Sequence, residues 1–265
     1  MTQTTLNFVH ANGFPSGSYQ ALFDSFPSNI NVIALDKYGH DPKYPVKDNW
    51  QPLVEQLIQY VEEQHQFGEP VVAVGHSFGG VLSFLAVCQR PDLFKGLIMI
   101  DPPVFTGSAA MIARILKKTK LIDKFSPAGR AKKRRSHWPI NSNVVELFSR
   151  RSLFKNFDPR CLNDYVKHGI IEKNDQLELA FRADIEAAIF RELPTNLNSY
   201  KNKLTVPAKL IFAEQTDVCP THFFKKFTKL NKLMQLSSVP GGHMFPLERP
   251  KETAQLIMET LKEFS

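Results

Sequence analysis

The sequence has few cysteines and no long apolar run. Its three cysteines, Cys88, Cys161 and Cys219, are widely spaced and form no C-x-x-C pair. This pattern argues against a disulfide framework and against a zinc site. Apolar stretches such as 97–100 are too short to cross a bilayer, and the first residues do not form a basic-then-apolar leader. We therefore expect a reduced, cytoplasmic protein.

The stretch Val71–Gly80 reads V-V-A-V-G-H-S-F-G-G, an apolar β-branched run that ends in G-x-S-x-G. Helix-compatible residues follow it up to Cys88. This order predicts a strand, a one-residue turn and a helix, with Ser77 raised above the strand end. The flanking glycines lack the Cβ atoms that would collide as strand and helix close on the turn. A solvent-exposed glycine-rich turn after a core strand is the alternative interpretation.

Short apolar runs alternate with amphipathic stretches at both ends of the chain. Because these runs are apolar on both faces, they predict a mostly parallel sheet covered on both sides, an α/β fold. Residues 104–200 contain helical stretches without a convincing strand, which predicts a helical insertion. The predicted strands cover 5–9, 31–36, 71–76, 96–101, 208–213 and, weakly, 233–236, and the predicted core helices cover 18–26, 48–66, the stretch after Ser77, and 250–264.

A serine hydroxyl needs a base within hydrogen-bond reach before it can act as a nucleophile. Among eight histidines, His243 has the best context, in a Gly-Gly loop between a strand and the terminal helix. The base needs a carboxylate that fixes its tautomer. Asp217 is the leading candidate, and Asp101 and Glu214, which also follow strands, are its rivals. His10 is expected to brace its own loop.

The chain resembles the α/β-hydrolase family. The G-H-S-F-G-G segment is similar to the family's nucleophile elbow. Val32–Asp36 with Gly39-His40 resembles a strand of the family and the loop after it, and 214–220 and 242–250 resemble its acid and histidine segments. The resemblance implies a core formed by residues 1–103 and 201–265 and a helical cap at 104–200. The sheet of this core should have about six strands, because the two leading strands of the family's fold are not expected here. It also implies a triad in the order Ser77, Asp217, His243.

An acyl-transfer site needs two backbone N–H donors for the oxyanion. We expect these from Phe78 and Phe14, and an amide near Asn12 is the alternative to Phe14. The pocket between cap and core is predicted to be lined by neighbouring loop residues, although the same side chains could simply be packing. These residues are Asn12, Val104, Phe105, Val218 and Met244.

The residues present predict a serine hydrolase without cofactor or metal, acting on a small-molecule carboxylic ester or thioester through an acyl-enzyme. An acyltransferase, a C–C hydrolase and a perhydrolase share the same triad and stay open as alternatives. A non-catalytic ligand-binding protein on this fold is the alternative from another class. The oligomeric state is left open.

Basic residues are concentrated in the insertion. Residues 111–167 hold 15 Lys or Arg and four acidic residues, with the densest run at Arg130–Arg135. The run is either a solvated helical face or a surface that attracts an anionic substrate or lipid. No nucleic-acid-binding module accompanies it, so we expect no specific nucleic-acid partner.

Overall fold

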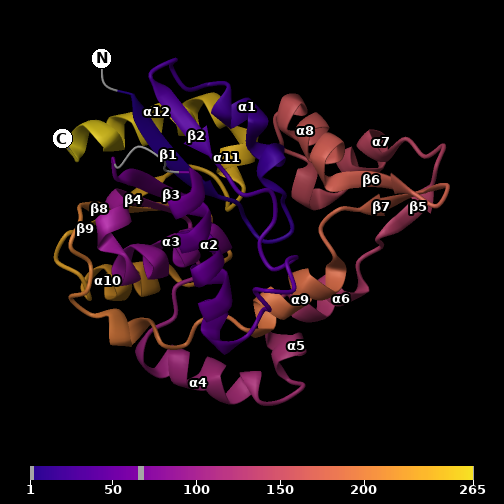
Figure 1. Cartoon of the computed structure of the whole chain (residues 1–265). Coiled ribbons are helices and arrows are strands. Elements are labelled where there is room, and N and C mark those ends of the chain that lie inside the picture. The colour runs from indigo at the N-terminus through magenta and orange to yellow at the C-terminus, as the bar shows by residue number, and fades with distance from the viewer. Residues whose placement is uncertain (1–2, 65–68, 265) are drawn as a thin grey trace.

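The computed structural model describes residues 3–64 and 69–264, so the predicted helix end at Gln66 lies outside the described residues. A six-stranded sheet forms the centre of the molecule (Figure 1). Its strand order is β2-β1-β3-β4-β8-β9, and every neighbouring pair is parallel. The predicted parallel sheet of about six strands is confirmed. The bounds are β1 Thr4–Val9, β2 Ile30–Ile33, β3 Val71–His76, β4 Phe94–Ile100, β8 Ala208–Ala213 and β9 Met234–Val239.

Side chains of successive strand residues enter two different hydrophobic cores, one on each face of the sheet. In β3, Val71 and Ala73 belong to the first core, while Val72 and Val74 belong to the second. This alternation explains why the strands are apolar throughout. The first face is covered by α2 Gln51–Gln64, α3 Phe78–Gln89 and α10 Thr221–Thr228, and the second by α1 Gln20–Phe23 and α12 Pro250–Glu263 (Figure 1).

Short helical turns fill several connections. They are η1 Ser16–Tyr19, η2 Asp48–Trp50, η3 Pro91–Leu93, η4 Ser152–Phe154, η5 Leu197–Tyr200 and α11 Phe245–Glu248. The helix expected to begin at Asp48 begins instead at Gln51, and Asp48 has a positive φ of 52°. Trp50 also has a positive φ, and its buried indole donates to Ile189 O at 3.0 Å. This hydrogen bond joins the start of α2 to the insertion.

The segment between β4 and β8 contains a small sheet as well as helices, which corrects the expectation of helices alone. Three antiparallel strands pair in the order β5-β7-β6. They have three or four residues each and are largely exposed, so no long apolar alternation marks them in the sequence. The bounds are α4 Gly107–Lys117, α5 Ile122–Phe125, α6 Ala128–Lys133, β5 His137–Pro139, α7 Val144–Ser149, α8 Pro159–Gly169, β6 Ile170–Lys173, β7 Gln176–Leu179 and α9 Ala183–Arg191.

This inserted segment, residues 104–200, is fixed to short helices that follow β1 and β9. In α8, Asp164 accepts from the N–H of Ala21 at 3.0 Å, and the N–H of Asp158 donates to Leu247 O. A Cβ at Gly17 would lie 2.3 Å from the ring of His168, so only glycine allows η1 to approach α8 this closely. The inserted segment therefore packs over the edge of the sheet at which Ser77 lies.

Among the described residues, no helix is both long enough and apolar enough to span a membrane. The three cysteines, Cys88, Cys161 and Cys219, are free thiols.

Candidate active site

The elbow at Ser77 has the geometry expected from its sequence. Ser77 joins β3 to α3 with φ 56° and ψ −119°, a conformation that side chains rarely adopt. A Cβ at Gly75 would lie 2.2 Å from Gly79 O, and one at Gly79 would lie 2.1 Å from Val9 O. The glycines are thus required for the contacts of the elbow with its own helix and with β1. Ser77 is half-buried, and its hydroxyl has no hydrogen-bond partner among the described residues.

His243 is paired with Asp101. Its Nδ1 lies 2.6 Å from Asp101 Oδ2, and because the carboxylate can only accept, Nδ1 carries the proton and donates. In the neutral imidazole, Nε2 of His243 then carries the lone pair. The expectation that Asp217 makes this contact is wrong, and the rival Asp101 makes it instead. Asp217 and Glu214 are both at the surface, and Glu214 accepts from the hydroxyl of Ser238 on β9.

The carboxylate of Asp101 is fully buried and fully satisfied. Its Oδ1 accepts from the N–H of Ala213 at 3.0 Å, and its Oδ2 also accepts from the hydroxyl of Thr216 at 2.6 Å. Asp101 directly follows β4 with a φ of 44°, so its side chain turns toward the neighbouring strand β8. These contacts hold the carboxylate in one position independently of its hydrogen bond with His243.

His76, the second residue of the G-x-S-x-G motif, connects the histidine loop to the loop after β1. Its Nε2 lies 3.0 Å from His243 O, so this nitrogen donates, and Nδ1 therefore accepts from the Tyr19 hydroxyl at 2.8 Å. The Tyr19 hydroxyl in turn accepts from the N–H of Ala11 at 3.1 Å. Burial lowers the pKa of His76 well below its usual value, and the nearby His243 lowers it further. A neutral His76 is the form that this chain of bonds requires.

The peptide unit between Ala11 and Asn12 is held by two hydrogen bonds to its carbonyl. Ala11 O accepts from Nδ1 of His10 at 2.8 Å and from the N–H of Phe14 at 3.1 Å. In a planar trans peptide, the N–H of Asn12 points away from that carbonyl, so its direction is set by the same two bonds. His10 also accepts from the N–H of Tyr38 at 3.2 Å, so it braces its loop as predicted.

The predicted oxyanion donor Phe14 already donates its N–H to Ala11 O, in a turn with Gly13 at φ 85°. Its ring packs against Phe154, Phe157 and Tyr165 of the inserted segment. The arrangement therefore disfavours Phe14 as a donor and favours the alternative amide, that of Asn12. The sequence pattern could not separate the two, because both follow the same short strand.

A buried ion pair lies against the same loop. Arg134 of the inserted segment pairs with Glu186 on α9 and donates to the hydroxyl of Tyr165 at 2.9 Å. A Cβ at Gly13 would lie 3.1 Å from the Glu186 carboxylate, and the side chain of Asn12 donates to Glu186 O at 3.0 Å. Burial raises the pKa of Glu186, although Arg134 opposes this shift. Sequence reasoning missed this contact because Arg134 is part of a run of otherwise exposed basic residues.

The predicted pocket residues have mixed surroundings. Val104 is fully buried in the first core, and Met244 is almost fully buried in the second. Phe105 is half-buried and meets Phe223 edge to face, and Val218 is half-buried with its N–H on the Thr216 hydroxyl. Their contact with a substrate therefore stays a prediction.

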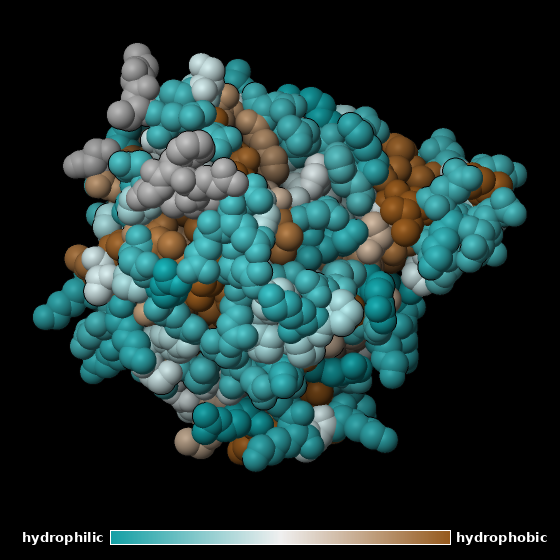
Figure 2. Space-filling view, in the orientation of Figure 1, coloured by the Kyte–Doolittle hydropathy of each residue, from teal (hydrophilic) through white to brown (hydrophobic). Residues whose placement is uncertain are grey.

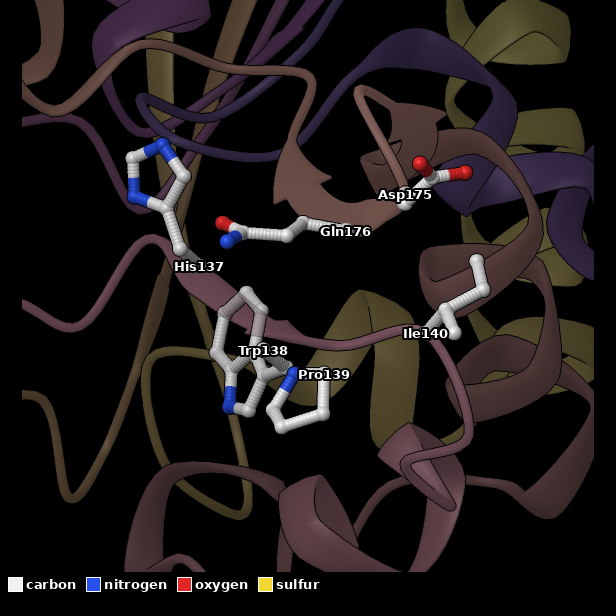
Figure 3. Close-up of a pocket in the computed structure, with 6 residues that line it drawn as sticks. All are labelled: His137, Trp138, Pro139, Ile140, Asp175 and Gln176. Atoms are coloured by element: carbon white, nitrogen blue, oxygen red, sulfur yellow. The ribbon is translucent and has the colours of Figure 1, made fainter.

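An open hollow of about 430 Å³ lies away from this site, on the small sheet of the inserted segment. In Figure 3, Gln176 points toward His137 on one side, while Ile140 and Asp175 lie on the other. None of its lining residues belongs to the Ser77 site. We find no cluster of three potential metal ligands in residues 3–64 and 69–264.

Comparison with known proteins agrees with this fold. The model of the "Alpha/beta hydrolase family" matches residues 8–256, nearly the whole chain. The chain belongs to the alpha/beta hydrolase family.

Relatives of this alpha/beta hydrolase include enzymes named for their activity. The human monoglyceride lipase is 27% identical over 165 residues, which cover 60% of this chain and 52% of that protein. The type I acyl-CoA thioesterase mpaH of Penicillium roqueforti is 24% identical over 226 residues, which cover 80% of this chain and 45% of that protein. The chain thus spans about half the length of these curated relatives.

Among solved structures, the peroxisomal alpha-beta-hydrolase Lpx1 of Saccharomyces cerevisiae superposes with a TM-score of 0.78 at 17% identity. The match covers 99% of this chain and 77% of that one. At this identity the likeness shows the fold alone.

The bridge through Tyr19 can be tested by Tyr19→Phe. This change leaves the N–H of Ala11 and Nδ1 of His76 buried without a partner, so we expect a loss of about 1–3 kcal/mol in the free energy of unfolding. Tyr44→Phe is the matched control, because its hydroxyl bonds to Gln59 away from the site. Urea unfolding of Tyr19→Phe indistinguishable from wild type would contradict the bridge.

Burial lowers the pKa of His10 from 6.5 to about 4. Below pH 6.5 the unfolded chain binds a proton that the folded chain does not, so stability should fall as pH decreases toward about 4. For His10 this loss amounts to about 3 kcal/mol at most. Urea unfolding at several pH values should give a shallower dependence for His10→Gln than for wild type. An equally steep slope in His10→Gln would contradict the assignment.

Proposed function

We propose that this protein is a serine hydrolase that cleaves a carboxylic ester or thioester through an acyl-enzyme. The observation that carries the proposal is the hydrogen bond of 2.6 Å between Nδ1 of His243 and the buried Asp101 carboxylate. The loop that contains His243 is held in turn by His76 of the elbow, which donates to His243 O. The rings of His76 and His243 have their centroids 4.9 Å apart, which places His243 beside the residue that precedes Ser77.

In the proposed first step, Nε2 of His243 takes the proton of the Ser77 hydroxyl as Oγ attacks the substrate carbonyl carbon. Asp101 keeps the proton of His243 on Nδ1 and stabilises the imidazolium that forms. The oxyanion is bound by two backbone donors, the N–H of Phe78 at the start of α3 and the N–H of Asn12. We favour Asn12 over Phe14 because the N–H of Phe14 is already bonded to Ala11 O.

In the second step the tetrahedral intermediate collapses, and His243 passes its proton to the leaving alcohol or thiol. Water then attacks the acyl-enzyme with His243 as base, which releases the acid and restores Ser77. A serine nucleophile fits this acyl transfer and needs no cofactor for any of its proton transfers.

We further propose that the inserted segment, residues 104–200, acts as a cap that shapes the substrate pocket. Its contacts with the loop after β1, through Asn12, Phe14 and Gly13, support this role. The relatives named as a monoglyceride lipase and an acyl-CoA thioesterase both cleave acyl groups from an oxygen or a sulfur leaving group. An acyl ester or acyl thioester is therefore the substrate class that we infer for this chain.

Ser77 is tested by covalent labelling. A fluorophosphonate should modify the wild type once, at Ser77, and leave Ser77→Ala unmodified by intact mass and peptide mapping. Hydrolysis of nitrophenyl esters and acyl-CoA substrates of varied chain length should fall by several orders of magnitude in the same variant. The matched control is Ser83→Ala on α3, a buried serine away from the elbow turn. Wild-type hydrolysis by Ser77→Ala would reject the proposal.

The acid is tested by comparing Asp101→Asn with Asp217→Asn. The amide oxygen introduced by Asp101→Asn could still accept from the N–H of Ala213, but the amide would not fix the tautomer of His243, so we expect a loss of about 10⁴ in kcat. Asp217 lies at the surface, and its replacement should change kcat by less than about twofold. Circular dichroism and thermal unfolding would establish that both variants fold. A crippled Asp217→Asn beside a mild Asp101→Asn would restore Asp217 as the acid.

A further inference from the structure

Large apolar side chains are exposed on α4 and α5. Met111 is 66% exposed, Ile115 is 61% exposed and Phe125 is 72% exposed, values typical of polar surface residues. We call these residues and their exposed neighbours the α4–α5 face. Its apolar members are Met111, Ile112, Ile115, Leu121 and Phe125.

The orientation of α4 is fixed by contacts on its other side. Ala110 is buried, and Lys117 pairs with Glu192 at 3.0 Å and donates to Asn49 Oδ1 and Leu193 O. Met111 and Ile115 lie one turn apart on the side of the helix opposite Lys117. Their exposure is therefore a consequence of how α4 is anchored.

Basic residues border the apolar side chains. Arg114, Lys118, Lys120 and Lys124 lie at the surface, and within the described parts of the chain none of them has an ion-pair partner. Residues 107–135 contain ten Lys or Arg and a single acidic residue, Asp123, which is paired with Arg191. The α4–α5 face thus combines apolar area with uncompensated positive charge.

We propose that the α4–α5 face docks this protein onto a bilayer surface that contains anionic lipid. Exposed apolar side chains would enter the region between headgroups and acyl chains, and the bordering basic residues would meet the lipid charges. The charge also argues against a second copy as the occupant, because two such faces would repel each other. Figure 2 shows hydrophobic surface interrupting the hydrophilic surface along the lower edge, where Figure 1 places α4.

Docking at this face has a geometric consequence for the site. The loop between β4 and α4 starts at Asp101, the partner of His243, and α4 begins at Gly107. Arg134, directly after α6, and Glu186 on α9 lie against Gly13 in the loop after β1. A bilayer on the α4–α5 face would therefore contact α4, the first helix after Asp101 in the chain. The docking itself does not depend on the proposed reaction.

The test measures binding of the wild-type chain to sucrose-loaded vesicles by sedimentation. The vesicles consist of ether-linked phosphatidylcholine, alone or with about 30 mol % of ether-linked phosphatidylserine, and contain no ester for the protein to cleave. We expect binding that requires phosphatidylserine and weakens as salt rises from about 0.05 to about 0.5 M.

Two variants address the two components. Met111→Gln/Ile115→Gln/Phe125→Gln should lower the partition coefficient at least about tenfold, because the apolar contribution is lost. Lys118→Gln/Lys120→Gln/Lys124→Gln should lower it by a similar factor on anionic vesicles only. Arg134 is left unchanged, because it belongs to the buried pair against Gly13.

Matched controls remove equivalent groups elsewhere. Ile140→Gln/Ile171→Gln/Leu233→Gln removes three exposed apolar side chains outside α4 and α5, and Lys225→Gln/Lys226→Gln/Lys229→Gln removes the same charge from and beside α10. Both controls should bind as the wild type does. Thermal unfolding should establish that all four variants fold.

The proposal is overturned if the wild type binds neither vesicle, or if the apolar variant binds as well as its control. It is also overturned if sedimentation without lipid shows a dimer that Met111→Gln/Ile115→Gln/Phe125→Gln abolishes, because a second copy would then cover this face.

Discussion

The buried carboxylate of Asp101 is the constraint on which the rest of the site depends. A fully buried charge is costly unless hydrogen bonds satisfy it, and here donors come from Ala213, Thr216 and His243. These donors belong to β8, the loop after β8 and the histidine loop. One side chain therefore joins β4 to the two segments that must be adjacent for an acyl-transfer site to exist.

Neutral histidines continue this arrangement from His243 to the loop after β1. His76 donates to the carbonyl of His243, and through Tyr19 it is connected to the N–H of Ala11. His10 holds the carbonyl of Ala11. The loop with the proposed oxyanion donor and the loop with the proposed base are thus positioned by one set of buried polar bonds. Such preorganisation is what electrostatic stabilisation of a transition state requires.

Much of this could be predicted from the sequence, because the local patterns are strong. The elbow needs glycine at Gly75 and Gly79 for close backbone contacts, and this requirement is visible in the sequence as the G-x-S-x-G motif. The strands are visible as apolar runs because both faces of the sheet are covered. The carboxylate that contacts His243 was predicted wrongly because Asp101 and Asp217 both follow strands. The deciding difference is depth, since Asp101 directly ends β4 and is buried while Asp217 lies beyond β8 at the surface. Depth is a tertiary property that no local motif encodes.

The inserted segment was harder to predict for the same physical reason. Its strands are short and largely exposed, and Arg134 is distinguished from the neighbouring basic residues only by its partners Glu186 and Tyr165. The basic residues of the insertion look alike in the sequence. In the structure they divide into Arg134, whose ion pair lies at the candidate site, and the exposed residues that border the α4–α5 face.

The most direct test of the account is a crystal structure of the protein after reaction with a small phosphonate ester. The account predicts a covalent bond from phosphorus to Ser77 Oγ, with His243 still paired to Asp101. The phosphoryl oxygen should lie about 3 Å from the backbone nitrogens of Phe78 and Asn12. A phosphonate on another residue, or a phosphoryl oxygen bound by the N–H of Phe14, would contradict it.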